Sequence, residues 1–286
     1  MVSGITAVVV VIVGGIITLS VTGGSGHKAA SKRTSTTASP PTTASPTTTP
    51  KPKAASSSTF SIARTLLQEV EGVPVATLVA AAEKDGSSVT RPEKLASSAP
   101  KLSVGAKPEV LYLGTEWCPF CAAERWSLVM ALSKFGTFGP LRGTTSSSAD
   151  TNASSPTFTF YHADFTSKYI AFVAIEEQTN TGQQLQAPTA AESALESKFD
   201  SAGSIPFIYM GGKYLVIGSQ YPSPALSNMA FSKAASYLTS GANATSKGAE
   251  AAAGYLVANI CALTHGQPVP VCSQVPASLQ GASSSS

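Results

Sequence analysis

The sequence predicts an α/β protein of the α+β sandwich type, with one transmembrane helix and a disordered linker before its folded domain. Three observations predict this class. Short apolar runs alternate with helical patterns over residues 101–275, residues 2–21 carry no charge, and Ser, Thr and Pro dominate residues 31–58. The expected parts are an anchor at 1–22, a linker at 23–59, an N-terminal extension at 60–100, a folded domain at 101–275 and a disordered tail at 276–286.

The apolar segment from Val2 to Val21 is long enough to cross the hydrocarbon core of a bilayer, which takes about 20 residues. A cleaved signal peptide is the alternative, but the basic n-region that it needs is missing and the apolar stretch is long for it. Basic residues at 27–33 favour a cytoplasmic location for that side. The linker composition and a second cysteine pair favour the opposite, so we expect a single-pass protein of the cell membrane with an extracytoplasmic domain.

The chain has 286 residues, a formal charge of +3 and only 12% charged residues. It has no basic stripe and no basic patch with interleaved aromatic residues, so we predict no nucleic-acid partner. Residues 31–58 cannot bury a core. They indicate either an extended stalk that holds the domain away from a membrane or a disordered tail without a spacing role.

The first half of the folded part alternates between helix and strand patterns. A helix is expected over Val75–Lys84, since Pro74 stands near its start, and a buried strand over Val110–Leu113. The elements expected next are a helix at 119–135 stopped by Gly136, a polar loop at 143–155 and a strand at 157–161.

In the second half, Tyr169–Ile175 is a strand or the start of a helix, and Thr189–Phe199 is a helix. Two apolar runs around Gly211-Gly212, at 204–210 and 213–217, predict a β-hairpin. The last expected helices are 224–240, with Ser223 as N-cap, Pro224 first and Gly241 beyond its end, and 246–265, stopped by Gly266.

A C-x-x-C pair, Trp117-Cys118-Pro119-Phe120-Cys121, follows the strand and opens the helix. With Cys118 as the N-cap, Pro119 takes the first helical position, where a missing N–H costs nothing. Backbone N–H groups and the positive end of the helix dipole then favour the thiolate of Cys118, the form that attacks disulfides. Cys121 lies one turn later on the same side, where it could close the ring and release the product.

Four neighbours of the pair are candidate site residues. Trp117 is expected to shield one side of the two cysteines and to help position the substrate. Glu116, Glu124 and Arg125 could tune the thiol pKa or shuttle a proton. The simpler interpretation of Glu124 and Arg125 is a solvated charge pair.

Three alternatives compete with a redox role for the C-x-x-C pair. The pair could be half of a zinc site, an inert disulfide or two free buried cysteines. A closed zinc site would need two further ligands, and the residues at hand form no second C-x-x-C: Cys261, Cys272, His162 and His265. We therefore predict no metal and no cofactor.

Ile205-Pro206 follows Gly203-Ser204 and precedes an apolar run. A cis bond here would face the backbone of Ile205 toward the cysteines, where it could pair with an extended substrate segment by strand addition. The alternative is a trans proline that opens an edge strand. Because Cys118 and Cys121 are present, we favour the cis form and assign Ile205 and Pro206 to substrate positioning.

Cys261 lies at the end of one helix and Cys272 in the proline-rich segment after it. A structural disulfide between them would pin the C-terminal segment to the domain and stabilise the fold by about 3 kcal/mol. It would also indicate an oxidising compartment. The alternative is an electron relay to Cys118 and Cys121.

Taken together, these elements resemble the thioredoxin superfamily over residues 101–241. Trp117 to Cys121 is similar to the thioredoxin and DsbA-type active site, and Ile205-Pro206 is similar to the cis-proline loop. The resemblance implies a thioredoxin-like fold with a helical insertion between Cys121 and Pro206. The chain departs from the family at Tyr112, where thioredoxin and DsbA place a buried acid. The Pro-Phe dipeptide between the cysteines leaves the direction of electron flow unassigned.

Residues 107–138 also resemble an uncharacterised archaeal and actinobacterial family, domain of unknown function 929. The resemblance rests on Cys-Ala-Ala-Glu-Arg-Trp at 121–126 and Phe-Gly-Thr-Phe at 135–138. The membrane anchor of that family matches the apolar segment from Val2 to Val21.

The sequence thus predicts a membrane-tethered thiol–disulfide oxidoreductase, with Cys118 as the attacking thiolate and Cys121 as the resolving thiol. Its expected partners are client proteins with thiols or disulfides, a membrane redox partner and the membrane itself. The alternative function is a non-catalytic thioredoxin-fold binding module or redox-sensing scaffold at the cell surface.

Overall fold

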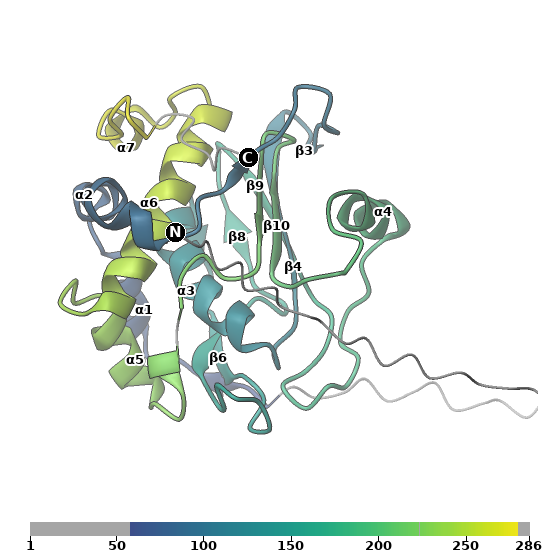
Figure 1. Ribbon diagram of the computed structural model, residues 1–286, viewed down its shortest axis with the longest axis vertical. Helices are drawn as coiled ribbons and strands as arrows, with labels where there is room; N and C mark the ends of the chain where they lie inside the picture. Colours follow the sequence, from purple (N-terminus) through teal and green to yellow (C-terminus); the bar gives the residue numbers. More distant parts are fainter. Residues whose placement is uncertain (1–57, 223, 280–286) are drawn as a thin grey trace, which may run out of the picture. The chain divides into compact units, whose positions relative to one another are not determined.

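The computed structural model describes residues 58–222 and 224–279 (Figure 1). The predicted anchor, residues 1–22, and nearly all of the predicted linker lie outside the described residues. All described residues belong to one compact unit, which includes the predicted N-terminal extension as well as the predicted domain. Among the helices of these two ranges, none has the length and apolar character that a bilayer crossing requires.

The central sheet has β4 (Lys107–Gly114) in its middle. On one edge, β4 pairs with antiparallel β10 (Phe207–Met210), which pairs with β11 (Tyr214–Ile217) and then β2 (Glu93–Lys94). On its other edge, β4 pairs in parallel with β9 (Ala171–Glu176). The first residues of β4 pair with antiparallel β3 (Ser103–Val104). The parallel register aligns Gly114 with Glu176, so the carboxyl ends of both strands meet at one edge of the sheet.

Helices cover both faces of this sheet. In Figure 1, α2 (Val75–Asp85), α3 (Pro119–Leu132) and α6 (Ala244–Leu263) lie on one side, and α4 (Ala190–Phe199) lies on the other. The pattern of β4 follows from this: Val110 and Tyr112 enter the large core, whereas Leu111 and Leu113 enter the smaller core that Leu195 of α4 closes. All four strand residues are fully buried, which explains why the strand is a continuous apolar run.

Helices α2 and α6 pack with their backbones in close approach. A Cβ atom on Gly254 of α6 would overlap the backbone carbonyl of Leu78 in α2. Gly254 therefore has no room for a side chain, and its position sets how closely the two helices approach.

Shorter elements complete the described part of the chain. A three-stranded sheet has the order β1-β6-β7, and β5 pairs with β8. Their bounds, with those of the remaining helices, are β1 Phe60–Ser61, β5 Thr137–Phe138, β6 Arg142–Thr145, β7 Pro156–Thr159, β8 Phe165–Thr166, α1 Arg64–Glu71, η1 Gly86–Ser88, η2 Pro224–Leu226, α5 Phe231–Leu238 and α7 Val269–Cys272.

Most predicted elements are confirmed. Pro74 is the N-cap of α2, and Thr189 caps α4 in a reciprocal capping box with Glu192. The hairpin turns at Gly211-Gly212, both of which have positive φ angles. The segment Tyr169–Ile175, left open as helix or strand, contains most of β9.

Three predicted segments differ from the structure. The helix expected at 224–240 is wrong, since a 3-10 turn at 224–226 is followed by Asn228 at φ 55° and α5 starts only at Phe231. The backbone N–H of Asn228 donates to the carbonyl of Ala153, which breaks the helical hydrogen-bond pattern there. The polar loop expected at 143–155 begins with residues of β6, and the first residues of the expected tail pack against the domain, with Leu279 only 4% exposed.

The predicted disulfide is present: the sulfur atoms of Cys261 and Cys272 are 2.00 Å apart. It joins the end of α6 to α7, and both cysteines are buried. The bond therefore fixes the segment after α6 to the domain, as the cysteine spacing predicts.

We predict that replacing both residues, Cys261→Ala with Cys272→Ala, lowers the free energy of unfolding by about 3 kcal/mol, because the short loop is no longer closed in the unfolded chain. Urea unfolding of the variant and the parent chain measures this difference. An unchanged stability would contradict the structural role. Altered thiol reactivity of Cys118 in the same variant would favour the electron relay.

Candidate functional site

The C-x-x-C pair lies at the point where β4 passes into α3. Cys118 is the N-cap of α3, its Sγ accepts a hydrogen bond from the backbone N–H of Cys121 at 3.1 Å, and Pro119 is the first helical residue. The predicted capping geometry is therefore confirmed. It points the sulfur of Cys118 at the N–H groups of the first helical turn, where a negative charge is stabilised.

The cis-proline prediction is also confirmed. The Ile205–Pro206 peptide bond is cis, and the Sγ of Cys118 lies 3.8 Å from the carbonyl oxygen of Ile205. Residues 87 positions apart in the sequence thus meet at the sulfur of Cys118. Ile205 is half-buried, so part of this residue is open to solvent beside the cysteine pair.

The two cysteines carry free thiols and differ in acidity. The pKa of Cys118 is lowered, chiefly because the thiol of Cys121 hydrogen-bonds to it. Burial opposes this shift, while the N–H of Cys121, the charge of Arg125 and the N–H of Phe120 add to it. Burial raises the pKa of Cys121 well above its ordinary value, and the neighbouring Cys118 adds to the rise. The arrangement favours one thiolate beside one thiol, with the thiolate on Cys118.

A buried ion pair lies behind the cysteines. Arg125 of α3 donates from Nε to Oε1 of Glu176 at 2.8 Å and from Nη2 to Oε2 at 2.6 Å, and both side chains are 0% exposed. Nη2 also donates to the carbonyl of Thr115, in the turn that carries the cysteines. Burial alone would lower the pKa of Arg125, but the carboxylate of Glu176 raises it. The guanidinium therefore stays charged close to the thiols.

The solvated charge pair proposed for Glu124 and Arg125 is wrong. Every residue of α3 except Phe120 is buried, because the helix is packed against α6, β7 and α1. Arg125 pairs with Glu176 instead of its neighbour in sequence.

Glu124 is a buried acid, and among the described residues its carboxyl group accepts a hydrogen bond on one oxygen only. Its side chain is 0% exposed, and Oε2 accepts from the backbone N–H of Gln220 at 2.9 Å. Burial raises the pKa of Glu124 to about 7, and the bond from Gln220 partly opposes the rise. Glu124 thus titrates near neutral pH, one turn after Cys121.

Trp117 and Glu116 are anchored by side chains that the sequence alone did not reveal. The indole Nε1 of Trp117 donates to Oε1 of Gln178 at 2.7 Å, which holds the half-buried ring beside Cys118. Glu116 is fully buried, and its Oε1 accepts from the hydroxyl of Thr159 at 2.6 Å. Both partners lie on or just after strands that neighbour the site.

Tyr112 occupies the position where the resembled family has a buried acid. Its ring is fully buried, and the guanidinium carbon of Arg125 lies 5.7 Å from the ring centroid. Burial raises the pKa of the Tyr112 phenol well above its ordinary value, Arg125 opposes this, and Cys121, Glu176 and Cys118 add to it. A Cβ atom on Gly114 would overlap the phenol oxygen, so Gly114 leaves the space that this side chain needs.

The four residues considered as further zinc ligands do not join the cysteine pair. Cys261 and Cys272 are bonded to each other. Across residues 58–222 and 224–279, no group of three or more His, Cys, Asp and Glu side chains is arranged to hold a metal ion.

Sequence reasoning missed Glu176, although a signal for it was present. An acidic residue directly after an apolar strand is expected at the carboxyl end of that strand, and parallel pairing with β4 brings this end to the C-x-x-C turn. The missing step was the pairing of β9 with β4, because Tyr169–Ile175 was compatible with a helix as well.

Residues 94–203 match the family model of a domain of unknown function (DUF929). The matched region contains Cys118, Cys121, Arg125 and Glu176, whereas Ile205 and Pro206 lie just beyond it. The chain matches no curated protein and no solved structure.

We predict that Glu124→Gln removes a pH dependence of stability. The pKa of Glu124 is higher in the folded chain than in the unfolded chain, so its contribution to the free energy of unfolding is fully present below about pH 4.5. That contribution is lost as the pH rises through about 7, which lowers the free energy of unfolding by up to about 3 kcal/mol. The Gln variant should gain stability relative to the parent as the pH rises from 5 to 8. Urea unfolding at both values measures this, with Glu93→Gln, at an exposed site, as the matched control. Parallel pH profiles for parent and E124Q would contradict the prediction.

We predict that Arg125→Met lowers the free energy of unfolding by about 3–5 kcal/mol, since Glu176 is left buried and unpaired. The double variant Arg125→Met with Glu176→Gln should recover most of this loss. Urea unfolding compares the two. Equal stabilities would show that the buried charge is not the cause.

The same Arg125→Met variant should raise the alkylation pKa of Cys118, because a positive charge that favours its thiolate is gone. Iodoacetamide alkylation across pH, read on a chain with Cys121→Ala in both parent and variant, gives this pKa. A pKa that is unchanged between the two would contradict the role of Arg125.

Proposed function

We propose that this chain is a membrane-tethered thiol–disulfide oxidoreductase with a thioredoxin-like domain at residues 101–275, which exchanges disulfides with extracytoplasmic client proteins. The observation that carries the proposal is the meeting of a helix-capping Cys118 of lowered pKa with the carbonyl of Ile205 at 3.8 Å. A lowered pKa at an N-cap cysteine favours the reactive thiolate.

The strand arrangement supports the thioredoxin-like assignment. The strand that carries the C-x-x-C pair lies between parallel β9 and antiparallel β10, and β10 starts right after the cis proline. Helix α4 lies between Cys121 and Pro206 in the sequence, as the resembled members with a helical insertion would have it. The DUF929 match over 94–203 is compatible with this assignment and names no activity.

The first chemical step is attack of the Cys118 thiolate on a disulfide of the client. A bond forms between Cys118 Sγ and one client sulfur, the client S–S bond breaks, and the second client sulfur leaves as a thiolate. The hydrogen bonds that the N–H and thiol of Cys121 give to Cys118 favour the attacking form before this step.

The second step releases the client. Cys121 loses its proton and attacks Cys118 Sγ, which forms the Cys118–Cys121 disulfide and frees the other client sulfur as a thiolate. One of the two client thiolates takes up the proton, so the client leaves with one thiol and one thiolate. Two electrons have passed from the dithiol to the client, and the reverse sequence oxidises a client dithiol. We propose that a membrane redox partner restores the starting state.

Exposed apolar side chains near the cysteines support a protein client. Phe120, between the two cysteines, is 54% exposed, and Ile217 is 36% exposed. Ile217 pairs in register with Phe207, the residue after Pro206, which places it at the same end of the sheet. An extended client segment could pair with the backbone at Ile205 and place apolar side chains on these residues.

We predict that Cys118→Ser lowers disulfide exchange with a client at least about 100-fold, because the attacking sulfur is gone. Cys121→Ala should instead accumulate a mixed disulfide, since the release step is blocked. Both variants are made in a Cys261→Ala, Cys272→Ala background, and reduction of a disulfide-bonded peptide is followed by gel shift. A Cys118→Ser variant with full activity would exclude the proposal.

A redox titration of the same background in glutathione buffers, read by thiol alkylation, assigns the direction. A two-electron transition near or above about −200 mV indicates an oxidase or isomerase, and one near about −270 mV indicates a reductase. A chain without a reversible transition would favour a non-catalytic binding module or redox-sensing scaffold.

A further inference from the structure

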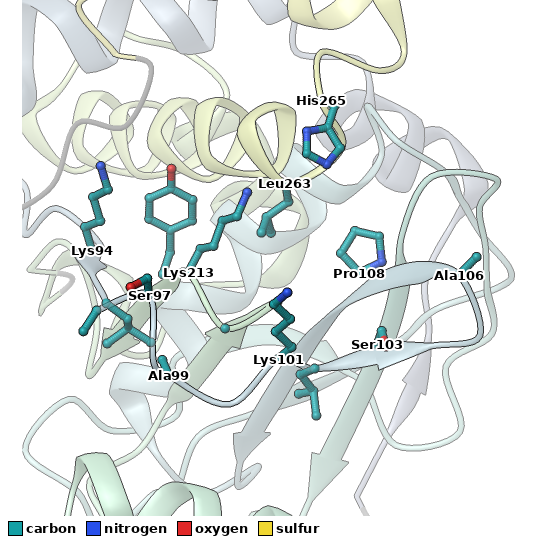
Figure 2. Close-up of a pocket in the computed structure, with 16 residues that line it drawn as sticks. Lys94, Ser97, Ala99, Lys101, Ser103, Ala106, Pro108, Lys213, Leu263 and His265 are labelled. Carbon is teal, nitrogen blue, oxygen red and sulfur yellow. The ribbon is translucent and has the colours of Figure 1, made fainter.

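A pocket lies at the end of the central sheet away from the cysteines. Its volume is about 680 Å³, and Pro108, near the start of β4, lines it, whereas the cysteines follow the last residue of the same strand (Figure 2). It is formed by the stretch from 94 to 108, the turn between β10 and β11 and the end of α6. The pocket is therefore separate from the C-x-x-C site and does not depend on the redox activity proposed above, although the choice of nanodiscs in its test rests on the proposed membrane tether.

The interior of this pocket is largely apolar. The side chains that give it this character are Leu95, Leu102, Pro108, Tyr214 and Leu263. The turn residues Gly211 and Gly212 shape it, because a Cβ on Gly211 would lie 2.8 Å from Leu263 and one on Gly212 2.5 Å from the carbonyl of Pro100. Both glycines also have φ angles near +57° and +79°, which side-chain-bearing residues rarely adopt.

Its charged lining residues all have the same sign. They are Lys94, Lys101 and Lys213, and no Asp or Glu lines the pocket, whereas His265 lies at its edge beyond the end of α6. In Figure 2, the side chains of Lys101 and Lys213 extend toward the end of α6 that carries Leu263 and His265. Within the described residues, none of the three lysines has an ion-pair partner. Two segments, the stretch from 94 to 108 and the turn between β10 and β11, thus place three lysines without an ion-pair partner around one apolar space.

Two acidic residues are sequence neighbours of residues that line the pocket. Glu93, the acidic neighbour of Lys94 in β2, is not among the residues that line the pocket. Glu109, beside Pro108 in β4, is buried and does not line the pocket either. No acidic side chain therefore shares the lining of the pocket with the three lysines.

We propose that this pocket binds an amphipathic organic anion, a molecule that joins a carboxylate, sulfate or phosphate group to an apolar body. The lysine ammonium groups would hold the anionic group, and the apolar interior would bury the body. A volume of this size is within the range of small-molecule sites. A bare inorganic anion would leave the apolar surface uncovered, and a neutral apolar ligand would leave the lysines without a counterion.

The test uses the full chain in nanodiscs of phosphatidylcholine, with naphthalene-2-sulfonate as the probe. Calorimetry, corrected with empty nanodiscs, should show one binding site per chain. Naphthalene-2-sulfonamide, the neutral analogue, and inorganic sulfate should each bind at least about tenfold more weakly. Equal binding of the neutral analogue or of sulfate would overturn the proposal, as would failure of the probe to bind.

The matched variants locate the site. Lys101→Glu with Lys213→Glu should weaken probe binding at least about tenfold, whereas Lys84→Glu with Lys233→Glu, which changes the net charge equally on exposed helix positions outside the pocket, should leave it unchanged. Circular dichroism and alkylation of Cys118 verify that both double variants are folded. Equal weakening by the two double variants would overturn the proposal, because it would show general charge attraction.

A competition experiment identifies the source of the natural ligand. Nanodiscs that contain phosphatidylglycerol should compete with the probe when the natural ligand is an anionic lipid, and they should leave its affinity unchanged when the ligand is a soluble organic anion. Both results require probe binding that depends on Lys101 and Lys213, so each supports the same site.

Discussion

The buried ion pair between Arg125 and Glu176 is the contact on which the rest of the site depends. Two opposite charges buried away from solvent stabilise each other, and this pair is bidentate through Nε and Nη2 of Arg125, whereas Nη1 has no hydrogen-bond partner among the described residues. Its atoms also bind the carbonyl of Thr115 and the N–H of Phe160. One interaction thus fixes α3, the end of β9, the turn before the cysteines and the residue after β7 relative to one another.

The difference between the two thiols follows from their places in this frame. Cys118 caps the helix, so N–H groups and the thiol of Cys121 face its sulfur, and the charge of Arg125 is close by. Cys121 lies within the helix against the core, where burial favours its protonated form. Identical side chains three residues apart therefore have opposite acid–base tendencies, set by desolvation and hydrogen bonding.

The sheet separates two chemically distinct ends. At the carboxyl end of β4 the backbone turns into a helix N-terminus that favours negative charge on sulfur. At the opposite end, the hairpin turn at Gly211-Gly212 and the stretch that carries Lys101 enclose an apolar space with basic groups at its edge. Two sites can therefore share a strand without sharing residues.

The sequence by itself determined the local features: the strand, the cap at Cys118, the hairpin, the capped helices and the pairing of Cys261 with Cys272. Each depends on residues near one another in the chain or on a residue type with few alternatives, such as proline, glycine or cysteine. Only the tertiary structure decided that Arg125 pairs with Glu176, that Glu124 is buried and that Asn228 interrupts a predicted helix. These outcomes depend on which strands pair and which helix faces are covered. These long-range contacts determine whether a charged side chain is removed from water, and the local sequence pattern does not encode them.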